Sequence, residues 1–326
     1  MKLGSLRSGK SRDGQLVVIR RDLKFYAIAS HICPTLREAV ENWASVSPAL
    51  ESLSQKLNDD LVGEKFPYNE NEMLSALPRT WLFADGSAFI HHIRLVRKAR
   101  NAEPPSTLLT VPLMYQAESG YFLAPTEGIP QRDVSHGTDF EAEVGVITDH
   151  VPMGVNPEKA LEHIKLIVLI NDVSLRGLIP EELAQGFGFF QSKPAKALSP
   201  VALTPEELEG AWANGRLSLP LHVRWNGDFF GRAQAGQMHF HFGQLISHAA
   251  KTRDLMPGTL IGSGTVSNED SQAGCSCIVE KRTLEQIETG SPITPYMKVG
   301  DTIEIFMENS RRELLFGRIF QKVVPR

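Results

Sequence analysis

Residues 139–147, Asp139-Phe-Glu141-Ala-Glu143-Val-Gly-Val-Ile147, place two glutamates one residue apart at the start of an apolar run. Side chains at alternate positions of a strand point to the same face, about 6–7 Å apart along it. This spacing is wide for a hydrogen bond, but it suits two oxygens that bind one hard cation. The stretch therefore predicts a buried β-strand whose first residues bind a divalent metal ion.

Two further acids follow the same logic. A second apolar run, residues 164–172, ends in Asp172, and a fourth acid, Asp85, precedes His92 by seven residues. The Asp85 carboxylate is suited to binding a metal, while the imidazole of His92 is suited to act as general base on a nearby water. Asp-Gly is also a common turn, so this pair by itself leaves a structural role open.

Length and composition limit the possible classes of protein. With 326 residues, one large domain plus a smaller one is the natural expectation. The apolar fraction of 42%, the charged fraction of 22% and the net charge of −4 are ordinary for a soluble globular protein, and they indicate no nucleic-acid or membrane surface. The basic run 94–100 is a local exception to this ordinary charge distribution. It is either the solvated face of a helix or a group of residues that holds an anionic substrate near the site.

The cysteines and the N-terminus indicate a cytoplasmic protein. Cys33, Cys275 and Cys277 are too few for a disulfide framework. The last two flank a single serine, which is neither a redox nor a zinc spacing, so we expect inert strand residues. The first residues lack the hydrophobic core of a signal peptide, and no apolar run reaches membrane length.

The pattern of elements predicts a mixed β-rich α+β fold. A hairpin of strands 14–20 and 23–29 and a helix from Thr35 to about Leu57 form a small N-terminal α+β domain, residues 1–76. Residues 77–326 form the larger domain, without the regular strand–helix alternation of a doubly wound sheet. Its clearest strands are predicted at 140–148, 164–172, 218–225, 276–281 and 302–307. Its helices are predicted at 157–163, 180–185, 205–212 and 242–252.

Residues 77–326 resemble the fumarylacetoacetate hydrolase family. The segments that carry the resemblance are Asp85-(six residues)-His92, Asp139-Phe-Glu141-Ala-Glu143, Asn171-Asp172-Val-Ser174-Leu-Arg176, Gln191-Ser-Lys193-Pro, Gly262-Ser-Gly264-Thr265-Val-Ser-Asn268 and Lys298-Val-Gly-Asp301-Thr-Ile-Glu304. The pair E-x-E and N-D-x-S-x-R at this separation is specific to that family. The N-terminal part looks like the small domain of longer members. The resemblance implies the family's β-roll and a homodimer.

The resemblance also implies roles for individual residues. Those matching the family's Mg²⁺ or Ca²⁺ ligands are Asp85, Glu141, Glu143 and Asp172. His92 matches the histidine that activates water, and Lys193 matches the lysine that stabilises negative charge on the substrate. Tyr115 and Thr265 match residues that contact substrate or line the site. Glu280 is the candidate for the glutamate that orients the histidine.

The chain departs from the fumarylacetoacetate-specific members at two positions. Where those members have a Gln and a Tyr that contact substrate, this sequence has Ile179 and Leu183. Gln185 or Gln191 is a candidate replacement for these contacts. The acyl group of the substrate therefore stays open.

The chemistry of the acids supports one function above two others. Clustered carboxylates need a cation, and all-oxygen ligands favour Mg²⁺, Ca²⁺ or Mn²⁺ over zinc. We expect hydrolysis of a carbon–carbon bond in a small β-diketo acid, such as fumarylacetoacetate, fumarylpyruvate or another acylpyruvate, in aromatic or tyrosine catabolism. The alternatives are a metal-dependent decarboxylase or isomerase of a 2-oxo acid on the same fold, and a metal-stabilised binding protein without turnover.

Overall fold

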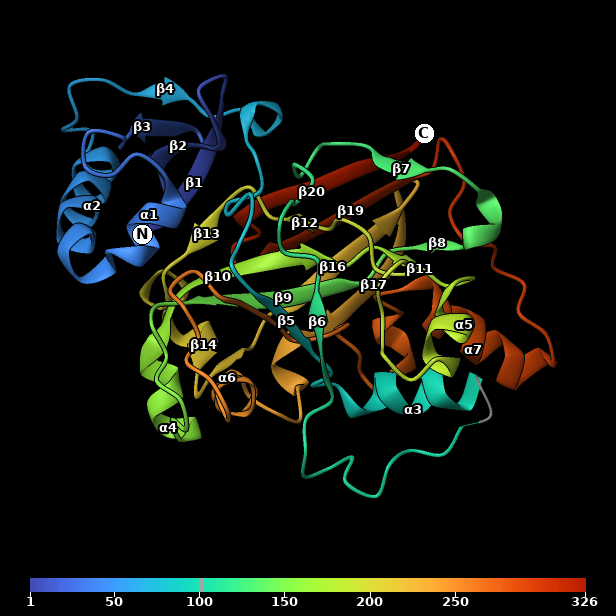
Figure 1. The fold of residues 1–326 in the computed structure, drawn as a ribbon. Coiled ribbons are helices and arrows are strands. Elements are labelled where there is room, and N and C mark those ends of the chain that lie inside the picture. Colours follow the sequence, from blue (N-terminus) through green and yellow to red (C-terminus); the bar gives the residue numbers. More distant parts are fainter. Residues whose placement is uncertain (100–101) are drawn as a thin grey trace.

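The computed structural model describes residues 1–99 and 102–326. Its small N-terminal part lies at one corner of a larger β-rich body (Figure 1). This arrangement confirms the predicted mixed β-rich α+β fold with a small N-terminal α+β portion. The elements of the N-terminal part are β1 (Lys2–Ser8), β2 (Ser11–Ile19), β3 (Phe25–Ile28), α1 (Leu36–Glu41), α2 (Trp43–Asn58) and β4 (Phe66–Pro67).

The predicted N-terminal hairpin and capped helix are both present. Strands β2 and β3 pair antiparallel. The Thr35 hydroxyl accepts a hydrogen bond from the Glu38 backbone N–H at 3.2 Å, as the capping-box pattern predicts. The single predicted helix is divided at Asn42, whose φ of −119° and ψ of 28° are not helical. Separate helices α1 and α2 result.

The N-terminal strands continue the main sheet of the body. Strand β1 pairs with β13 (Ala202–Leu203), so the N-terminal part is hydrogen-bonded to the rest of the chain, and the division at residue 76 stays a prediction. The eleven-stranded sheet runs β4-β3-β2-β1-β13-β10-β9-β18-β5-β6, with β12 paired to β10. The strands not yet placed are β5 (Phe83–Gly86), β6 (Met114–Ala117), β9 (Ala142–Thr148), β10 (Ile164–Asn171), β12 (Ala197–Leu198) and β18 (Leu260–Gly262).

The two predicted apolar strands form the centre of this sheet. Strands β9 and β10 are antiparallel neighbours, and Glu143 lies opposite Ile170. Every residue of β9 and all but one of β10 are buried, because the sheet is covered on both faces there. Strand β18 joins β9 to β5, and Gly262 lies opposite both Gly145 and Asp85. The ends of three neighbouring strands thus meet at one place.

A second sheet of five strands packs beside the first. Its order is β17-β16-β19-β20-β7, and β16 and β19 confirm the strands predicted at 218–225 and 302–307. Asn226 and Gly227 have φ of 54° and 85°, as expected for the tight turn between β16 and β17. The strands of this sheet and of two small ones are β7 (Ile129–Gln131), β8 (Thr138–Asp139), β11 (Ser174–Leu175), β14 (Trp212–Ala213), β15 (Arg216–Leu217), β16 (Pro220–Trp225), β17 (Asp228–Gln234), β19 (Thr302–Glu308) and β20 (Leu314–Pro325).

Most helices lie where they were predicted, but two segments differ. Helices α4 (Pro157–Ala160), α5 (Ile179–Ala184) and α6 (Phe242–Ala249) match predictions, while 205–211 is a 3₁₀ helix. Helix α3 (Ile90–Ala99) was not predicted. The strand predicted at 276–281 is wrong, because α7 (Ile278–Thr289) begins there. Neither Cys275 nor Cys277 therefore lies in a strand, and Cys277 is the N-cap residue of α7.

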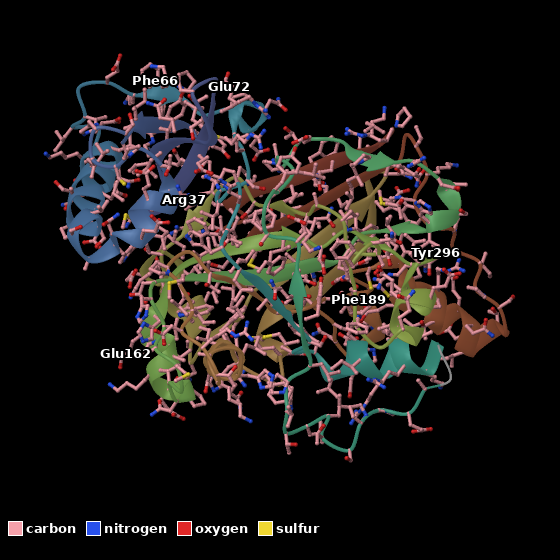
Figure 2. All side chains as sticks on the ribbon, in the orientation of Figure 1. Arg37, Phe66, Glu72, Glu162, Phe189 and Tyr296 are labelled. Carbon is pink, nitrogen blue, oxygen red and sulfur yellow. The ribbon has the colours of Figure 1, made fainter. Side chains whose placement is uncertain are left out.

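Buried apolar side chains fill the interior between the sheets and their covering helices (Figure 2). Helices α3, α5 and α7 lie together at the end of the body away from the N-terminal part (Figure 1). In the described part of the chain, no helix has the length and apolar character needed to span a membrane.

Candidate active site

Four acids from separate segments are buried at the meeting point of the central strands. Asp85 is in β5, Glu143 is the second residue of β9, Glu141 immediately precedes β9, and Asp172 immediately follows β10. Their exposed fractions are between 0% and 4%. Gly262 is required beside them, because a Cβ at this position would lie 2.2 Å from Oδ1 of Asp85. The strand register therefore brings carboxylates together that are far apart in the sequence.

Three of the four acids form a compact group. One carboxylate oxygen each from Asp85, Glu143 and Asp172 lies within 4.8 Å of the others. Both oxygens of Glu143 are buried and have no hydrogen-bond partner among the described residues. Burial and the nearby charges of Asp85 and Asp172 raise the pKa of Glu143 well above its ordinary value. Unpartnered buried carboxylate oxygens on an all-oxygen donor set fit a hard divalent cation.

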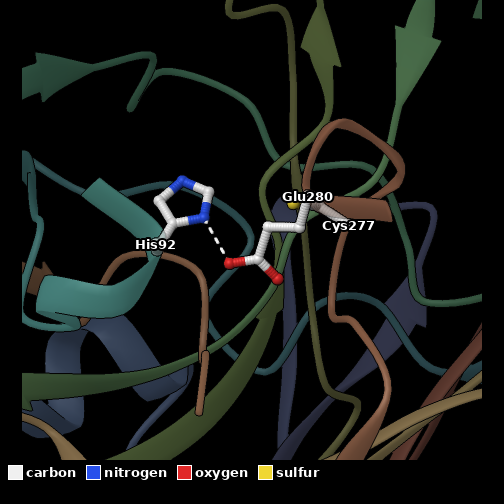
Figure 3. A group of neighbouring side chains, drawn as sticks. All are labelled: His92, Cys277 and Glu280. Atoms are coloured by element: carbon white, nitrogen blue, oxygen red, sulfur yellow. Dashed lines mark hydrogen bonds and ion pairs between the residues drawn. The ribbon is translucent and has the colours of Figure 1, made fainter. Parts of the chain in front are cut away.

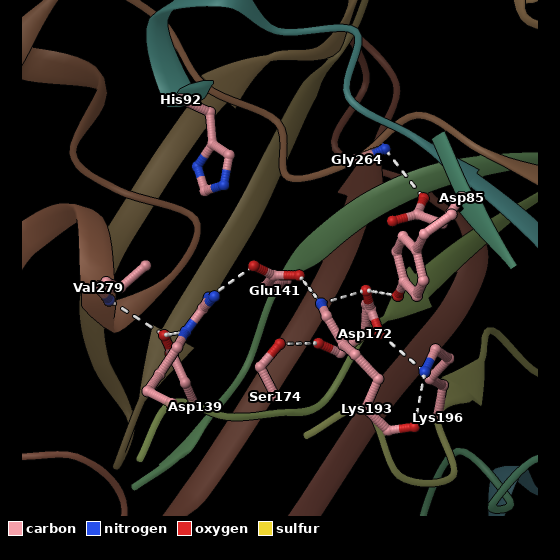
Figure 4. Close-up of polar contacts among 12 residues, drawn as sticks. Asp85, His92, Asp139, Glu141, Asp172, Ser174, Lys193, Lys196, Gly264 and Val279 are labelled. Atoms are coloured by element: carbon pink, nitrogen blue, oxygen red, sulfur yellow. Dashed lines mark hydrogen bonds and ion pairs between the residues drawn. The ribbon is translucent and has the colours of Figure 1, made fainter. Parts of the chain in front are cut away.

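Glu141 has a different environment from the other three acids. Its Oε1 accepts a hydrogen bond from Nη2 of Arg176 at 2.5 Å, and its Oε2 accepts one from Nζ of Lys193 at 2.6 Å. Burial alone would raise the pKa of Glu141, but the charges of Arg176 and Lys193 hold it well below its ordinary value. Glu141 therefore lies at the edge of the acidic trio with both oxygens occupied (Figure 4).

Lys193 connects Glu141 to the trio. Its ammonium also donates to Oδ2 of Asp172 at 2.6 Å, and the Tyr115 hydroxyl donates to the same oxygen at 2.9 Å. Burial would lower the pKa of Lys193, but Asp172 and Glu141 raise it above its ordinary value. The fully buried Lys196 lies with Nζ 3.1 Å from Oδ1 of Asp172, without the alignment of a hydrogen bond. Lys193 is therefore a fixed positive charge inside the site.

Arg176, the last residue of the N-D-x-S-x-R motif, contacts two of the buried acids. Its Nε donates to Oδ2 of Asp139 at 2.9 Å while its Nη2 contacts Glu141. Asp139 in turn accepts hydrogen bonds from the backbone N–H groups of Ile278 and Val279, at 2.8 and 3.0 Å. These are the free donors at the start of α7, so a buried carboxylate fixes where this helix begins.

The buried charges of this network do not balance. Its carboxylates are Asp85, Asp139, Glu141, Glu143 and Asp172, and its cations are Arg176, Lys193 and Lys196. When all are ionised, two negative charges remain in a region with little access to water. One divalent cation would neutralise them, which is the second indication of a metal site here.

His92 and Glu280 meet beside the acidic cluster. His92 is on α3 and Glu280 is in the first turn of α7, and Nδ1 of the imidazole lies 2.8 Å from Oε1 of the buried carboxylate. The other ring nitrogen, Nε2, has no hydrogen bond within the described residues, and His92 lines the cavity described next. A carboxylate that holds Nδ1 leaves Nε2 available for proton transfer.

A cavity of about 390 Å³ lies between these groups, and its lining is chemically mixed. The charged and polar lining includes Asp85, Glu141, Glu143, Arg176, Lys193 and His92. The apolar lining includes Ile93, Val96, Leu113, Met114, Leu183 and Phe189. Tyr115 and the buried Thr265 also line the cavity, and Phe189 packs edge-on against Tyr115. The cavity can therefore hold a small acid with an apolar segment.

Among the described residues of the basic run 94–100, Arg97 is the one basic residue that lines this cavity. Its Nη1 donates to the backbone oxygen of Glu103, while the other cavity cations, Arg176 and Lys193, are paired with carboxylates. Arg94 points to solvent, with a side chain 54% exposed. Arg100 lies outside the described residues. The structure thus divides the run between a solvated face and a cavity wall.

The structure does not bring two of the proposed substrate contacts to the cavity. Gln191 is exposed and lines a different surface depression, while its backbone N–H is held by Glu182. Gln185 is also exposed. Leu183 lines the cavity without a polar atom, and Ile179 is buried. The side of the cavity near α5 is therefore apolar, and we assign no substrate contact to either glutamine.

Comparison with known proteins gives two family matches. A family model described as "Fumarylacetoacetate (FAA) hydrolase C-terminal" matches residues 82–324, and one described as "Fumarylacetoacetase N-terminal domain 2" matches residues 1–79. A curated relative, the 2,4-didehydro-3-deoxy-L-rhamnonate hydrolase of Sphingomonas sp. (strain SKA58), is 26% identical over 203 residues. The match covers 61% of this chain and 62% of the relative, so the chain spans about three fifths of that protein's length.

Two solved structures share the fold over the whole chain. Maleylpyruvate hydrolase from Sphingobium sp. SYK-6, in complex with manganese(II) and pyruvate, is 14% identical with a TM-score of 0.64, covering 100% of this chain and 99% of the other. The 5-carboxymethyl-2-hydroxymuconate delta-isomerase from Mycobacterium smegmatis is 17% identical with a TM-score of 0.61, at the same coverage. At such identities the likeness establishes the fold, whose members carry both hydrolase and isomerase names.

The unpartnered oxygens of Glu143 predict that this acid contributes to metal binding but does not stabilise the metal-free protein. Glu143→Gln keeps the shape of the side chain but removes its charge. We expect it to abolish most of the stabilisation by Mg²⁺ or Mn²⁺, which reaches about 2.7 kcal/mol at a hundredfold excess over Kd. The metal-free variant should be at least as stable as the metal-free wild type, because a repelled charge is gone. Thermal unfolding with and without metal measures both effects. Glu64→Gln, at an exposed position, is the control, and an unchanged metal response in Glu143→Gln would contradict the assignment.

Asp85 predicts how the stability of the metal-free protein changes with pH. Burial and the charges of Asp172 and Glu141 raise the pKa of Asp85 from 3.8 to about 8. Below pH 4 both the folded and unfolded states carry the proton, so nothing is lost. Between pH 4 and 8 only the folded state keeps it, and the free energy of unfolding falls by up to about 1.4 kcal/mol per pH unit.

Chemical denaturation of the wild type and Asp85→Asn from pH 5 to 9, in chelator, measures this contribution. The wild type should lose stability relative to the variant as the pH rises, and the difference should level off above about pH 8. A difference that does not depend on pH would show that Asp85 is ionised in the metal-free protein.

Proposed function

The chain belongs to the fumarylacetoacetate hydrolase family, and from this premise we propose that it is a metal-dependent hydrolase of a carbon–carbon bond in a small β-diketo acid. The observation that carries the proposal is the position of the His92–Glu280 pair. His92, held by Glu280, lines the same cavity as Lys193 and two acids of the trio, Asp85 and Glu143. A candidate general base, a candidate cation site and a fixed positive charge therefore adjoin one substrate-sized space.

The residues that would hold the metal are the trio Asp85, Glu143 and Asp172, with Glu141 as a fourth ligand or as the anchor of Lys193 and Arg176. Mg²⁺, Ca²⁺ and Mn²⁺ suit these oxygen donors. When bound, such an ion supplies Lewis-acid polarisation of the oxygens of a β-diketo acid.

The protein's own groups account for the remaining chemistry. Glu280 orients the His92 imidazole through Nδ1, so that Nε2 can accept a proton from a water molecule that attacks the keto carbon. Lys193, held rigidly by Glu141 and Asp172, stabilises the negative charge that develops on the substrate. Losing one such preorganised donor typically lowers the rate by about 10²–10³. The Tyr115 hydroxyl keeps Asp172 in place.

The mixed lining of the cavity supports an acylpyruvate-type substrate. Its charged and polar residues suit the diketo acid portion, while its apolar residues suit an acyl chain. Fumarylacetoacetate, fumarylpyruvate and related acylpyruvates combine these parts, and we place the enzyme in aromatic or tyrosine catabolism. The structural neighbour named maleylpyruvate hydrolase supports this class of substrate.

The second candidate is a decarboxylase or isomerase of a 2-oxo acid on the same fold. A solved structure with the same fold is named as an isomerase, and this supports the second candidate. It would use the cation and Lys193 without needing a base that activates water. The role of His92 therefore separates the two functions.

Removal of the metal and of His92 tests the proposed reaction. Chelator-treated protein should not cleave fumarylpyruvate or fumarylacetoacetate, and Mg²⁺ or Mn²⁺ should restore cleavage. His92→Ala should lower kcat by about 10²–10⁴, the usual contribution of a general base. His91→Ala, the neighbouring residue on α3, is the matched control. Loss of substrate absorbance measures hydrolysis, and full hydrolysis by His92→Ala would contradict the role of His92 as the base. A protein that instead decarboxylates or isomerises a 2-oxo acid, with His92→Ala equally active, would favour the second candidate.

Arg97 predicts a preference for an acyl chain that ends in a carboxylate. Arg97→Gln should raise KM for fumarylpyruvate about 10–100-fold, since a hydrogen bond to a charged group contributes roughly 1.5–3 kcal/mol. KM for acetylpyruvate, which lacks the second carboxylate, should change little. Lys98→Gln, at an exposed position on the same helix, serves as the control. Equal effects on KM for both substrates would show that Arg97 does not contact the carboxylate of the acyl chain.

A further inference from the structure

A second group of possible metal ligands lies beside the acidic cluster. One ligand atom each from His92, Cys277 and Glu280 lies within 4.8 Å of the others. Cys277 and Glu280 are 0% and 2% exposed, while His92 is partly exposed to the cavity. Figure 3 shows the imidazole facing the Glu280 carboxylate, with Cys277 beside the backbone end of the Glu280 side chain. No residue of this group belongs to the trio of acids.

The backbone holds these three donors in place. Cys277 is the N-cap of α7 and Glu280 is in its first turn, three residues later, so both side chains lie on the same side of the helix start. Asp139 fixes that helix start through Ile278 and Val279. His92 comes from α3, and its Nδ1 is already 2.8 Å from Glu280. The three donors are therefore gathered by structure that exists without any ion.

The donor set is chemically unlike that of the acidic trio. It combines a sulfur, an imidazole nitrogen and one carboxylate oxygen, the ligands that zinc prefers. Zinc bond lengths of about 2.0–2.3 Å place the ligand atoms of one tetrahedral ion roughly 3.3–3.8 Å apart. The present separations are within 4.8 Å, so binding one ion requires the ligand atoms to move closer by about an ångström. Mg²⁺ and Ca²⁺ gain little from a thiol or an imidazole.

We propose that His92, Cys277 and Glu280 form a binding site for a soft divalent ion such as Zn²⁺, and that occupation of this site inhibits the enzyme. The site itself is independent of the reaction, whereas the inhibition rests on the proposed role of His92 as the base. An ion between His92 and Glu280 replaces their hydrogen bond and binds Nδ1 of the imidazole, which leaves the ring proton on Nε2. Nε2 is then unable to accept a proton from water, whether or not the acidic trio holds a cation.

A catalytic role for Cys277 as a nucleophile is less well supported. The thiol is fully buried and does not line the cavity. Burial and the charge of Glu280 also raise the pKa of the Cys277 thiol well above its ordinary value. A nucleophilic cysteine must be ionised without a bound metal, whereas a cation that binds the sulfur itself displaces the thiol proton.

Cobalt(II) tests the site without any substrate. Added to Mg²⁺-saturated protein, one equivalent of Co²⁺ should produce the intense near-ultraviolet absorption of a cobalt–thiolate bond. The band should persist in the double variant Cys33→Ser/Cys275→Ser, in which Cys277 is the only cysteine that remains. It should be absent in Cys277→Ser. A wild-type protein that shows no thiolate band would overturn the proposal, and this outcome needs no variant to fold.

Zinc inhibition supplies the second measurement. In excess Mg²⁺, Zn²⁺ should inhibit substrate cleavage, and chelation of zinc should restore it. In Cys277→Ser the zinc concentration for half inhibition should rise about tenfold or more, since even weaker changes around a metal lower affinity roughly 10–100-fold. Cys275→Ser, two residues away and also buried, should respond like the wild type.

The two measurements test separate parts of the proposal. Equal zinc sensitivity in Cys277→Ser and Cys275→Ser would overturn the inhibitory site. If the cobalt band appears but no β-diketo acid is cleaved, the metal site stands and the proposed function fails.

Discussion

Mutual repulsion among five buried carboxylates is the constraint on which the rest of this structure depends. Asp85, Asp139, Glu141, Glu143 and Asp172 are all nearly inaccessible to water, where an unpaired charge is very costly. Arg176, Lys193 and Lys196 compensate three of these charges. The two acids left without a cation are Asp85 and Glu143, and their pKa values are both raised, which favours their protonated forms. The protein thus keeps part of its interior unfavourable, and a divalent cation would relieve it.

The same ion pairs also position the groups that are not part of the acidic trio. Asp139 receives Arg176 on one side and the first N–H groups of α7 on the other. Through α7, it sets the location of Glu280 and therefore of the His92 imidazole. A single carboxylate thereby links the acidic trio to the His92–Glu280 pair, and through Cys277 to the proposed second metal site. Changes at Asp139 would be expected to disturb all three together.

The sequence predictions were accurate where interactions between nearby residues determine the structure, and they failed where contacts between distant segments do. The β9 and β10 strands were predictable because long apolar runs with polar ends are a local signal, and the hairpin at Asn226-Gly227 depends on two residues. The segment 276–281 was predicted as a strand from its apolar residues, but Asp139, over 130 residues earlier, supplies the helix cap. Likewise, Gln191 has a suitable side chain, but contacts with Glu182 hold its loop away from the cavity.

The sequence by itself determined the fold class, the candidate acids at the ends of the central strands and the candidate base His92. It could do so because alternation along a strand and the motif spacings are local patterns. Only the tertiary structure decided which of these residues lie in contact with one another. It grouped Asp85, Glu143 and Asp172, paired Glu141 with two cations, and brought Glu280 and Cys277 to His92. The physical reason is that the pairing of charges depends on distances between segments far apart in the chain, which sheet register and helix packing set and no local pattern contains.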